Sequence, residues 1–318
     1  MTALSHRRSS LARFGLAIAF GLAALARPAS AKDVSGRWLM DFHSDGSIDL
    51  TLKRGTTRGG NGNWSSSDEY EIQDFQGLSR PAAGADVPAA FRLVRDAGTV
   101  TFEGRLDDRG GAGRFTFAPN PEYIAALKAM GYPKPDADET FSLAVHDVSR
   151  TFMRDLEGLG YKRVPLDDLL SMRIHGAGPE FIRELKTLGY TGLSMDELVS
   201  MRIHGATPEF ISEMKDLGYS RLSADDLVSM RIHNVTPETI RDLGALGYKN
   251  LSADDLVSMS IHGATPDFAR SMKELGYSDL TPDDLVSMRI HNVTPDFVRG
   301  LQELGYQDVT ADEVPPRR

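Results

Sequence analysis

Residues 222–248 read LSADDLVSMRIHNVTPETIRDLGALGY, and related copies of this stretch fill the second half of the chain. The dipeptide Gly-Tyr ends the stretch and recurs every 29 residues, at 131–132, 160–161, 189–190, 218–219, 247–248, 276–277 and 305–306. A fixed period of this length is typical of proteins built from stacked helical hairpins. The second half of the chain is therefore predicted to be a repeat array.

Turn and capping residues within the stretch predict two helices per unit. Ser223 can cap the first helix, with Asp226 at the capping-box position three residues later. Asn234 can adopt the left-handed conformation that ends this helix. Thr236 can cap a second helix, which opens with Pro237. Each unit is therefore predicted to be a helical hairpin, and the array an α-solenoid.

The first helix of each unit carries a wide apolar arc. In the unit 191–219 this arc contains Leu198, Met201 and Ile203, so we expect it to be buried against neighbouring units. Arg202 lies inside the arc, and the same position holds Arg173, Arg231 and Arg289 in other units, with Ser260 as the exception. Because Asp or Glu begins every first helix, we expect a ladder of arginine with aspartate between repeats.

Residues 33–118 alternate apolar and polar side chains, which predicts β-strands instead. We expect strands at 36–43, 47–54, 91–95, 99–105 and 114–118, a turn at 108–111, and a short helix or an extra strand at 68–77. Five or six strands in this length indicate an antiparallel sheet curled into a partial barrel or sandwich. Pro121 begins a helix almost directly after the last strand, so we expect the sheet to cap the first hairpin.

The predicted fold class is therefore α+β and multidomain. A signal peptide is expected at 1–31, an antiparallel β-domain at 32–118 and the α-solenoid at 119–314. The solenoid is divided into a half unit at 119–132, a divergent unit at 133–161, five regular units at 162–306 and a partial unit at 307–314.

The first residues have the pattern of a secretory signal peptide. Arg7, Arg8 and Arg13 precede an apolar run at 14–26, which is shorter than the roughly 20 residues of a spanning helix. The run is followed by Ala-Ser-Ala at 29–31, a small-residue motif that predicts cleavage after Ala31. Both the general secretion route and twin-arginine export remain open. We expect a periplasmic or secreted protein with no stable membrane insertion.

Composition excludes several kinds of chemistry. The chain has no cysteine, so disulfides and thiolate sites are excluded. Its net charge is −9, and removal of the signal peptide, with four arginines and no acids, makes it −13. Such an acidic body repels phosphate backbones, so we expect no nucleic-acid partner. The glycine-rich residues 59–64 lack the lysine of a phosphate-binding loop, and no cofactor is expected.

Three sets of motifs carry a resemblance to known proteins: Gly-Arg-Trp at 36–38, the segment 91–99 with Phe-Thr-Phe at 115–117, and the Gly-Tyr repeats. On these motifs the chain resembles a class of exported bacterial proteins with a β-domain followed by Gly-Tyr helical repeats. It is also similar to the C-terminal sensor region of some membrane metallopeptidases of the β-lactam-sensor type. Neither the transmembrane helices nor the His-Glu-x-x-His motif of the peptidase part is present here, so the resemblance implies sensing or protein binding in the cell envelope.

The repeated arginines and histidines are the candidate partner-binding residues. Histidine recurs at the end of each first helix, where it can cap the helix; a metal or pH-sensing role is the alternative. Neighbouring repeats lie about 10 Å apart, so two histidines cannot share a metal ion without a carboxylate, and no metal site is assigned. The candidates are Arg173, His175, Arg202, His204, Arg231, His233, His262, Arg289 and His291.

Asp168, Ser171 and His175 share one helix face and resemble a hydrolase triad in composition. The same set repeats in several units on an exposed face that offers no oxyanion hole, so we expect a non-enzymatic protein. The favoured function is a protein-binding scaffold or sensor-type adaptor for an envelope or periplasmic protein. The alternative is a sensor of a small ligand, a metal or pH that uses the β-domain or the histidine row. A structural spacer is the remaining hypothesis.

Overall fold

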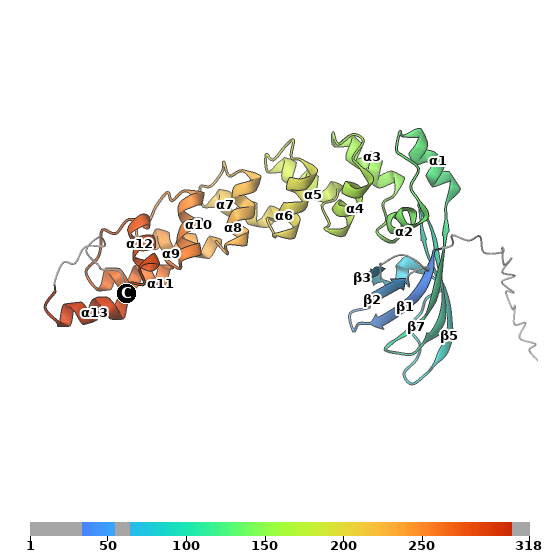
Figure 1. The fold of residues 1–318 in the computed structure, drawn as a ribbon, viewed down its shortest axis with the longest axis horizontal. Coiled ribbons are helices and arrows are strands. Elements are labelled where there is room, and N and C mark those ends of the chain that lie inside the picture. Colours follow the sequence, from blue (N-terminus) through green and yellow to red (C-terminus); the bar gives the residue numbers. More distant parts are fainter. Residues whose placement is uncertain (1–33, 55–63, 307–318) are drawn as a thin grey trace, which may run out of the picture.

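The computed structural model of the protein describes residues 34–54 and 64–306 and has the predicted α+β class (Figure 1). A curled sheet of seven antiparallel strands lies at one end, and a curved array of helices extends away from it. The predicted signal peptide at 1–31, the glycine-rich segment before Trp64 and the partial unit at 307–314 lie outside the described residues.

The sheet has the strand order β3-β2-β1-β7-β6-β5-β4. Its strands are β1 (Ser35–Phe42), β2 (Ser47–Arg54), β3 (Trp64–Glu71), β4 (Phe75–Gln76), β5 (Val87–Arg95), β6 (Gly98–Leu106) and β7 (Gly110–Pro119). The segment 68–77 contains the end of β3, a short 3₁₀ helix at Ile72–Asp74 and β4.

The predicted turn at 108–111 is partly wrong, because β7 already begins at Gly110. Gly110 pairs with Asp41 of β1, and Gly111 pairs with Leu106 of β6. A Cβ added at either glycine would lie about 2 Å from a backbone oxygen of the neighbouring strand. These two glycines therefore allow the close strand approach that lengthens β7.

Aromatic side chains fill the inner face of the sheet. The Trp38 ring contacts Phe91 edge to face at 5.3 Å, and Phe91 stacks on Phe102 at 4.7 Å. Phe141 enters from the helical part and stacks on Phe115 of β7, with ring centroids 5.4 Å apart. The core of the sheet is thus closed by a side chain of the helical array.

From α3 onward the helices form two rows according to which neighbours they contact, and α1 and α2 are counted with these rows by their order in the chain. The even row contains α2 (Ala137–Val145), α4 (Leu166–Ile174), α6 (Met195–Ile203), α8 (Ala224–Ile232), α10 (Ala253–His262) and α12 (Pro282–Ile290). The odd row contains α1 (Pro121–Ala129), α3 (Arg150–Gly158), α5 (Pro179–Thr187), α7 (Pro208–Asp216), α9 (Pro237–Ala245), α11 (Pro266–Glu274) and α13 (Pro295–Glu303). Among the described residues, no helix has the length and apolarity needed to cross a membrane.

Local signals set the ends of these helices as the sequence predicts. Ser223 accepts a hydrogen bond from Asp226 N, and the Asp226 carboxylate accepts one from Ser223 N, which completes a capping box. Asn234 has a positive φ of 56° after α8, and Thr236 caps α9. The buried side chains of both rows belong to one continuous apolar core that also includes the core of the sheet.

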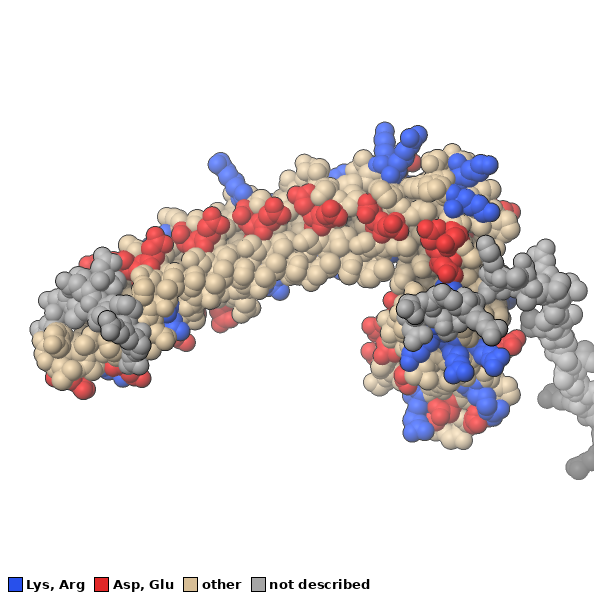
Figure 2. Space-filling model, in the orientation of Figure 1, with Lys and Arg blue, Asp and Glu red and all other residues tan. Residues whose placement is uncertain are grey.

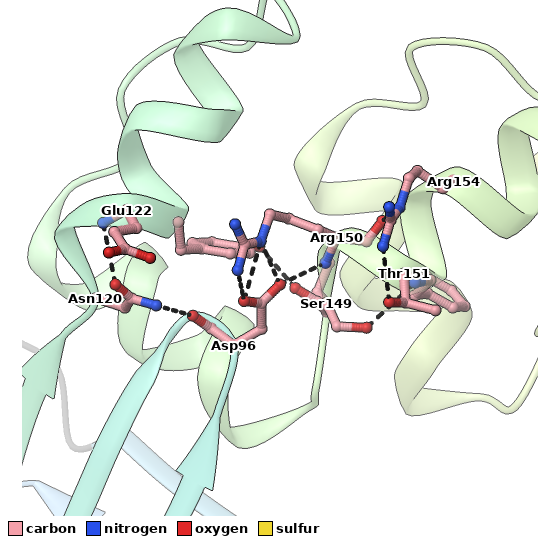
Figure 3. Close-up of polar contacts among 10 residues, drawn as sticks. Asp96, Asn120, Glu122, Ser149, Arg150, Thr151 and Arg154 are labelled. Atoms are coloured by element: carbon pink, nitrogen blue, oxygen red, sulfur yellow. Dashed lines mark hydrogen bonds and ion pairs between the residues drawn. The ribbon is translucent and has the colours of Figure 1, made fainter.

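Asp96, in the turn between β5 and β6, joins the sheet to the helices (Figure 3). Its carboxylate accepts hydrogen bonds from the Arg150 guanidinium, the shortest at 2.6 Å, and from the Arg150 backbone N–H at 2.8 Å. Its carbonyl accepts a bond from Asn120, the residue that caps α1. The hydrogen bonds from Arg150 hold the pKa of Asp96 below its usual value. One loop residue thus fixes the starts of α1 and α3 against the sheet.

We expect the variants D96N and R150Q to lower the urea midpoint of the transition that reports on the sheet, as followed by the fluorescence of its two tryptophans, Trp38 and Trp64. Because the folded protein holds the pKa of Asp96 low, its contribution is present above the unfolded pKa and is lost as pH falls through the folded value. The difference between wild type and D96N should therefore shrink in acid. R154Q, which changes the neighbouring exposed arginine, is the control. A D96N midpoint equal to wild type at neutral pH would contradict this role.

Candidate binding surface

The arginines predicted to contact a partner lie between neighbouring helical pairs. Each places its guanidinium over a phenylalanine ring of the preceding odd-row helix. The pairs are Arg173 over Phe152 at 5.0 Å, Arg202 over Phe181 at 5.1 Å, Arg231 over Phe210 at 5.0 Å and Arg289 over Phe268 at 5.1 Å. The first two also donate from Nε to the backbone carbonyls of His146 and His175, at 2.9 and 3.4 Å. A cation is favoured at these carbonyls because they lie at helix C-termini.

The predicted ladder of arginine with first-turn aspartate is wrong. Arg173 does pair with an aspartate, but Asp147 follows the end of α2. The first-turn acids have another role, since Glu197 and Asp226 accept hydrogen bonds from the backbone of their capping residues. The arginines extend toward the C-terminus of the preceding even-row helix, whereas these acids lie at helix N-termini.

The left-handed residue after each even-row helix completes what we call the arginine clamp: an arginine, the phenylalanine ring beneath it and this residue. Gly176, Gly205 and Gly263 occupy the position, and an added Cβ would lie 3.0–3.3 Å from Nη2 of the arginine in the next repeat. Glycine therefore makes room for the guanidinium.

At one interface, all three positions of the clamp hold a residue other than glycine, phenylalanine and arginine. Asn234 stands in the left-handed position, Thr239 replaces the phenylalanine and Ser260 replaces the arginine. The Ser260 hydroxyl still donates to the carbonyl of His233. At the Arg173 interface the ring contact is kept although Asp147 stands in the left-handed position, so the arginine and the ring are the constant parts of the clamp. The arginines therefore serve the packing between repeats.

The histidines lie at the ends of the even-row helices, as predicted. His175, His204, His233 and His291 are C-cap residues, and His262 is the last residue of α10. Among the described residues, no group of three or more His, Asp or Glu side chains is placed to hold a metal ion. The metal and pH-sensing roles of the row remain predictions.

His146, the most N-terminal histidine of the series, has a different environment. Its side chain is half-buried at the sheet junction, with Nδ1 3.9 Å from Asp68. Burial lowers the pKa of His146, although the Asp68 charge opposes this shift.

Five isoleucines are exposed in equivalent positions, which corrects the expected burial of Ile203. The apolar arc of α6 is too wide for one interface, since Met201 and Ile203 lie about 200° apart on a helix with 100° per residue. Leu198 and Met201 are fully buried and Ile203 projects outward. The exposed fractions are 52% for Ile174, 53% for Ile203, 52% for Ile232, 54% for Ile261 and 56% for Ile290.

We call the surface formed by these residues and their neighbours the isoleucine face. On α8, Asp225, Val228 and Ile232 lie three and four residues apart and therefore share one side of the helix. Each regular even-row helix repeats the pattern with an exposed Asp, an aliphatic residue and an exposed Ile. Figure 2 shows acidic side chains in a row along these helices, beside a band without charged residues. The exposed aspartates of the repeated pattern are Asp167, Asp196, Asp225, Asp254 and Asp283.

A double-mutant cycle at Arg231 and Phe210 tests the arginine clamp. We expect R231M and F210L each to destabilise the protein, with a coupling of about 0.5–1 kcal/mol for the lost contact between cation and ring. The same cycle with S260A and T239A, at the equivalent positions of the interface without a clamp, is the control and should show no coupling. Additive effects at both interfaces in urea unfolding would rule out the clamp.

The chain was compared with protein-family models, curated proteins and solved structures, and nothing in these three sets matches it. Its function is therefore inferred from its own sequence and geometry.

Proposed function

We propose that this chain is an exported, non-enzymatic scaffold whose 29-residue hairpins form an α-solenoid and bind a protein partner through the isoleucine face. The observation that carries the proposal is the row of five isoleucines, each more than half exposed in the same position of its repeat. Single exposed apolar residues are common, but an aligned apolar row beside charged residues is typical of an interaction surface.

The charge of the face indicates the chemistry of the partner. One exposed aspartate stands seven residues before each isoleucine, at the N-terminal end of the same helix. A polypeptide that carries apolar side chains together with lysine or arginine would bury the isoleucines and neutralise the acids. Complementary charges of this kind accelerate association and select the partner.

The packing of the arginines supports a revised assignment of the binding residues. Arg202 and Arg231 pack on phenylalanine rings of the neighbouring repeat, which gives both residues a role within the array, although Arg202 is also exposed. The histidines border the isoleucine face, each directly after an isoleucine in sequence. We therefore assign the partner contacts to the isoleucines and aspartates, with the histidines at the edge.

The non-enzymatic part of the proposal rests on what the acids do. In a hydrolase triad the acid orients the histidine. Here the Glu197 carboxylate accepts hydrogen bonds from the backbone N–H and the hydroxyl of Ser194. The acid of the repeated Asp-Ser-His pattern is thus engaged at the helix cap. The predicted signal peptide and the resemblance to envelope sensor regions support the cell envelope as the location of the proposed scaffold.

A second candidate function, binding of a small anion, is favoured by one feature of the sheet. Arg37 on β1 lies directly opposite Lys53 on β2 and, on its other side, opposite Arg114 on β7, which in turn faces Glu103 on β6. Like charges in such positions destabilise a sheet, and an anion would relieve the repulsion. The three basic side chains line a cavity of about 810 Å³. A rise in the melting temperature with inorganic phosphate, lost in R37Q, would support this candidate.

The isoleucine face is tested with the triple variant I203D/I232D/I261D. These side chains are exposed, so we expect the fold to be retained and partner binding to fall by about a hundredfold, from roughly 1 kcal/mol per lost isoleucine contact. A matched triple variant, T187D/S212D/A245D, adds the same charges to exposed positions of the odd row.

The measurement is photocrosslinking in intact cells from residue 232 and, for comparison, residue 245, followed by titration of the captured protein with each purified variant. The proposal requires a partner that crosslinks from 232, binds the odd-row variant normally and loses affinity for the isoleucine variant. Equal binding to both triple variants would show that the isoleucine face is not the binding surface.

A further inference from the structure

A ladder of side-chain hydrogen bonds connects the odd-row helices to one another. In α5, α7, α11 and α13, a lysine or glutamine near the end of the helix donates to the carbonyl of the leucine that caps the preceding odd-row helix. The pairs are Lys186 with Leu159 at 2.7 Å, Lys215 with Leu188, Lys273 with Leu246, and Gln302 with Leu275 at 2.8 Å. Each donor lies 27 residues after its acceptor.

A tyrosine ring adds to the environment of the ammonium group. Lys215 Nζ lies 5.9 Å from the ring centroid of Tyr190, and Lys273 Nζ lies 5.2 Å from that of Tyr248. Each tyrosine comes two residues after the acceptor leucine. The ladder position therefore binds a cation with a carbonyl at a helix C-terminus and with the face of a ring.

The ladder is interrupted at α9, where Gly244 takes the place of the lysine. The acceptor residue Leu217 and the tyrosine Tyr219 are both present, but glycine supplies no donor. A Cβ built on Gly244 has no atom within 4 Å, so the space is open. A cavity of about 490 Å³ lies here, lined by Gly244, Leu217 and Tyr219 among others.

We propose that this cavity, the ammonium notch formed by Leu217, Tyr219 and Gly244, binds a primary alkylammonium group from another molecule. The ammonium donates to the Leu217 carbonyl and lies over the Tyr219 ring, and its alkyl chain occupies the space above Gly244. The geometry repeats the position of Lys273 one unit further along the chain. The notch lies in the odd row and does not depend on the isoleucine face.

The side chains of Arg241 and Lys249 line the notch, and their positive charges repel a bound ammonium group to different degrees. Arg241 precedes the ladder position by three residues, but Arg183 and Arg270 stand in the same relation to Lys186 and Lys273. An arginine there is thus compatible with an ammonium at the carbonyl. The position equivalent to Lys249 in the next repeat holds Ser278. The positive charge of Lys249 therefore has no equivalent near Lys273. Removing that charge should strengthen binding.

The test uses n-butylammonium, which carries the four carbons and the ammonium of a lysine side chain. We expect saturable shifts of the Gly218, Tyr219 and Gly244 amide signals when the full-length protein is titrated and followed by NMR. K249S should bind about three- to fivefold more tightly, as expected for removal of one nearby exposed charge. G244K, which restores the ladder, should abolish the shifts and melt at a higher temperature than G244A.

The controls separate the notch from unspecific effects. A245K adds the same charge one residue away, where the side chain is exposed, and should bind n-butylammonium like the wild type. Butan-1-ol has the alkyl chain without the charge and should produce no saturable shifts. Shifts that persist unchanged in G244K, or that butan-1-ol reproduces, would overturn the proposal.

The alkylammonium can come from a free amine or from a lysine side chain. Nα-acetyl-lysine methylamide distinguishes the two sources. Tighter binding of this compound than of n-butylammonium would assign the notch to lysines of a polypeptide, and the reverse order would assign it to free amines. Because the isoleucine variants leave the notch intact, failure of one proposal is distinguishable from failure of the other.

Discussion

The helices of this protein are too short to be stable alone, and the rest of the structure follows from that constraint. Each spans nine residues, and α10 spans ten, whereas isolated helices below about 12–15 residues are marginal in water. Every helix therefore depends on burial against the next pair, as the fully buried Met201 and Met230 illustrate. An array of this kind also needs a closed end, and the sheet provides one through Phe141 and Arg150.

The arginines of the even row and the lysines of the odd row both place a cation at the C-terminus of a helix in the preceding repeat. A short helix leaves a large fraction of its carbonyls unpaired at its C-terminus. Arg202 donates to the carbonyl at the end of α4, and Lys186 donates to the carbonyl at the end of α3. At the equivalent interfaces of Arg231 and Arg289 the guanidinium keeps its contact with the ring, but its Nε has no hydrogen-bond partner among the described residues. The unit 220–248 lacks the phenylalanine of the clamp at Thr239 and the lysine of the odd-row ladder at Gly244, while Ser260 of the next unit still donates to the carbonyl of His233. Because stability in such arrays is a sum over neighbouring interfaces, we infer that this unit is the weakest point of the array.

The sequence predicts the elements well and their contacts less well. Capping residues and Gly-Tyr spacing indicate the helices, because these signals act within a few residues. The ladder of arginine and aspartate failed because charge alone does not show which end of the neighbouring helix an arginine reaches. The clamp could have been found by noting that Asn234, Thr239 and Ser260 depart from the repeat together. The exposure of Ile203 could not have been predicted from the sequence, because an apolar arc wider than one interface does not show which of its residues are buried.

The exposed isoleucines are stronger evidence for a binding surface than the row of acids is. All even-row helices have the same orientation, so any residue favoured at a helix N-terminus is repeated as a row on the surface. Acids are favoured there for stability alone, through capping boxes such as that of Asp226 and through the helix dipole. No such local preference places isoleucine in the last turn of a helix, where burial is only half complete and β-branching lowers helix propensity. The isoleucine row is therefore the part of the face that helix stability does not explain, and the inference of a partner rests on it.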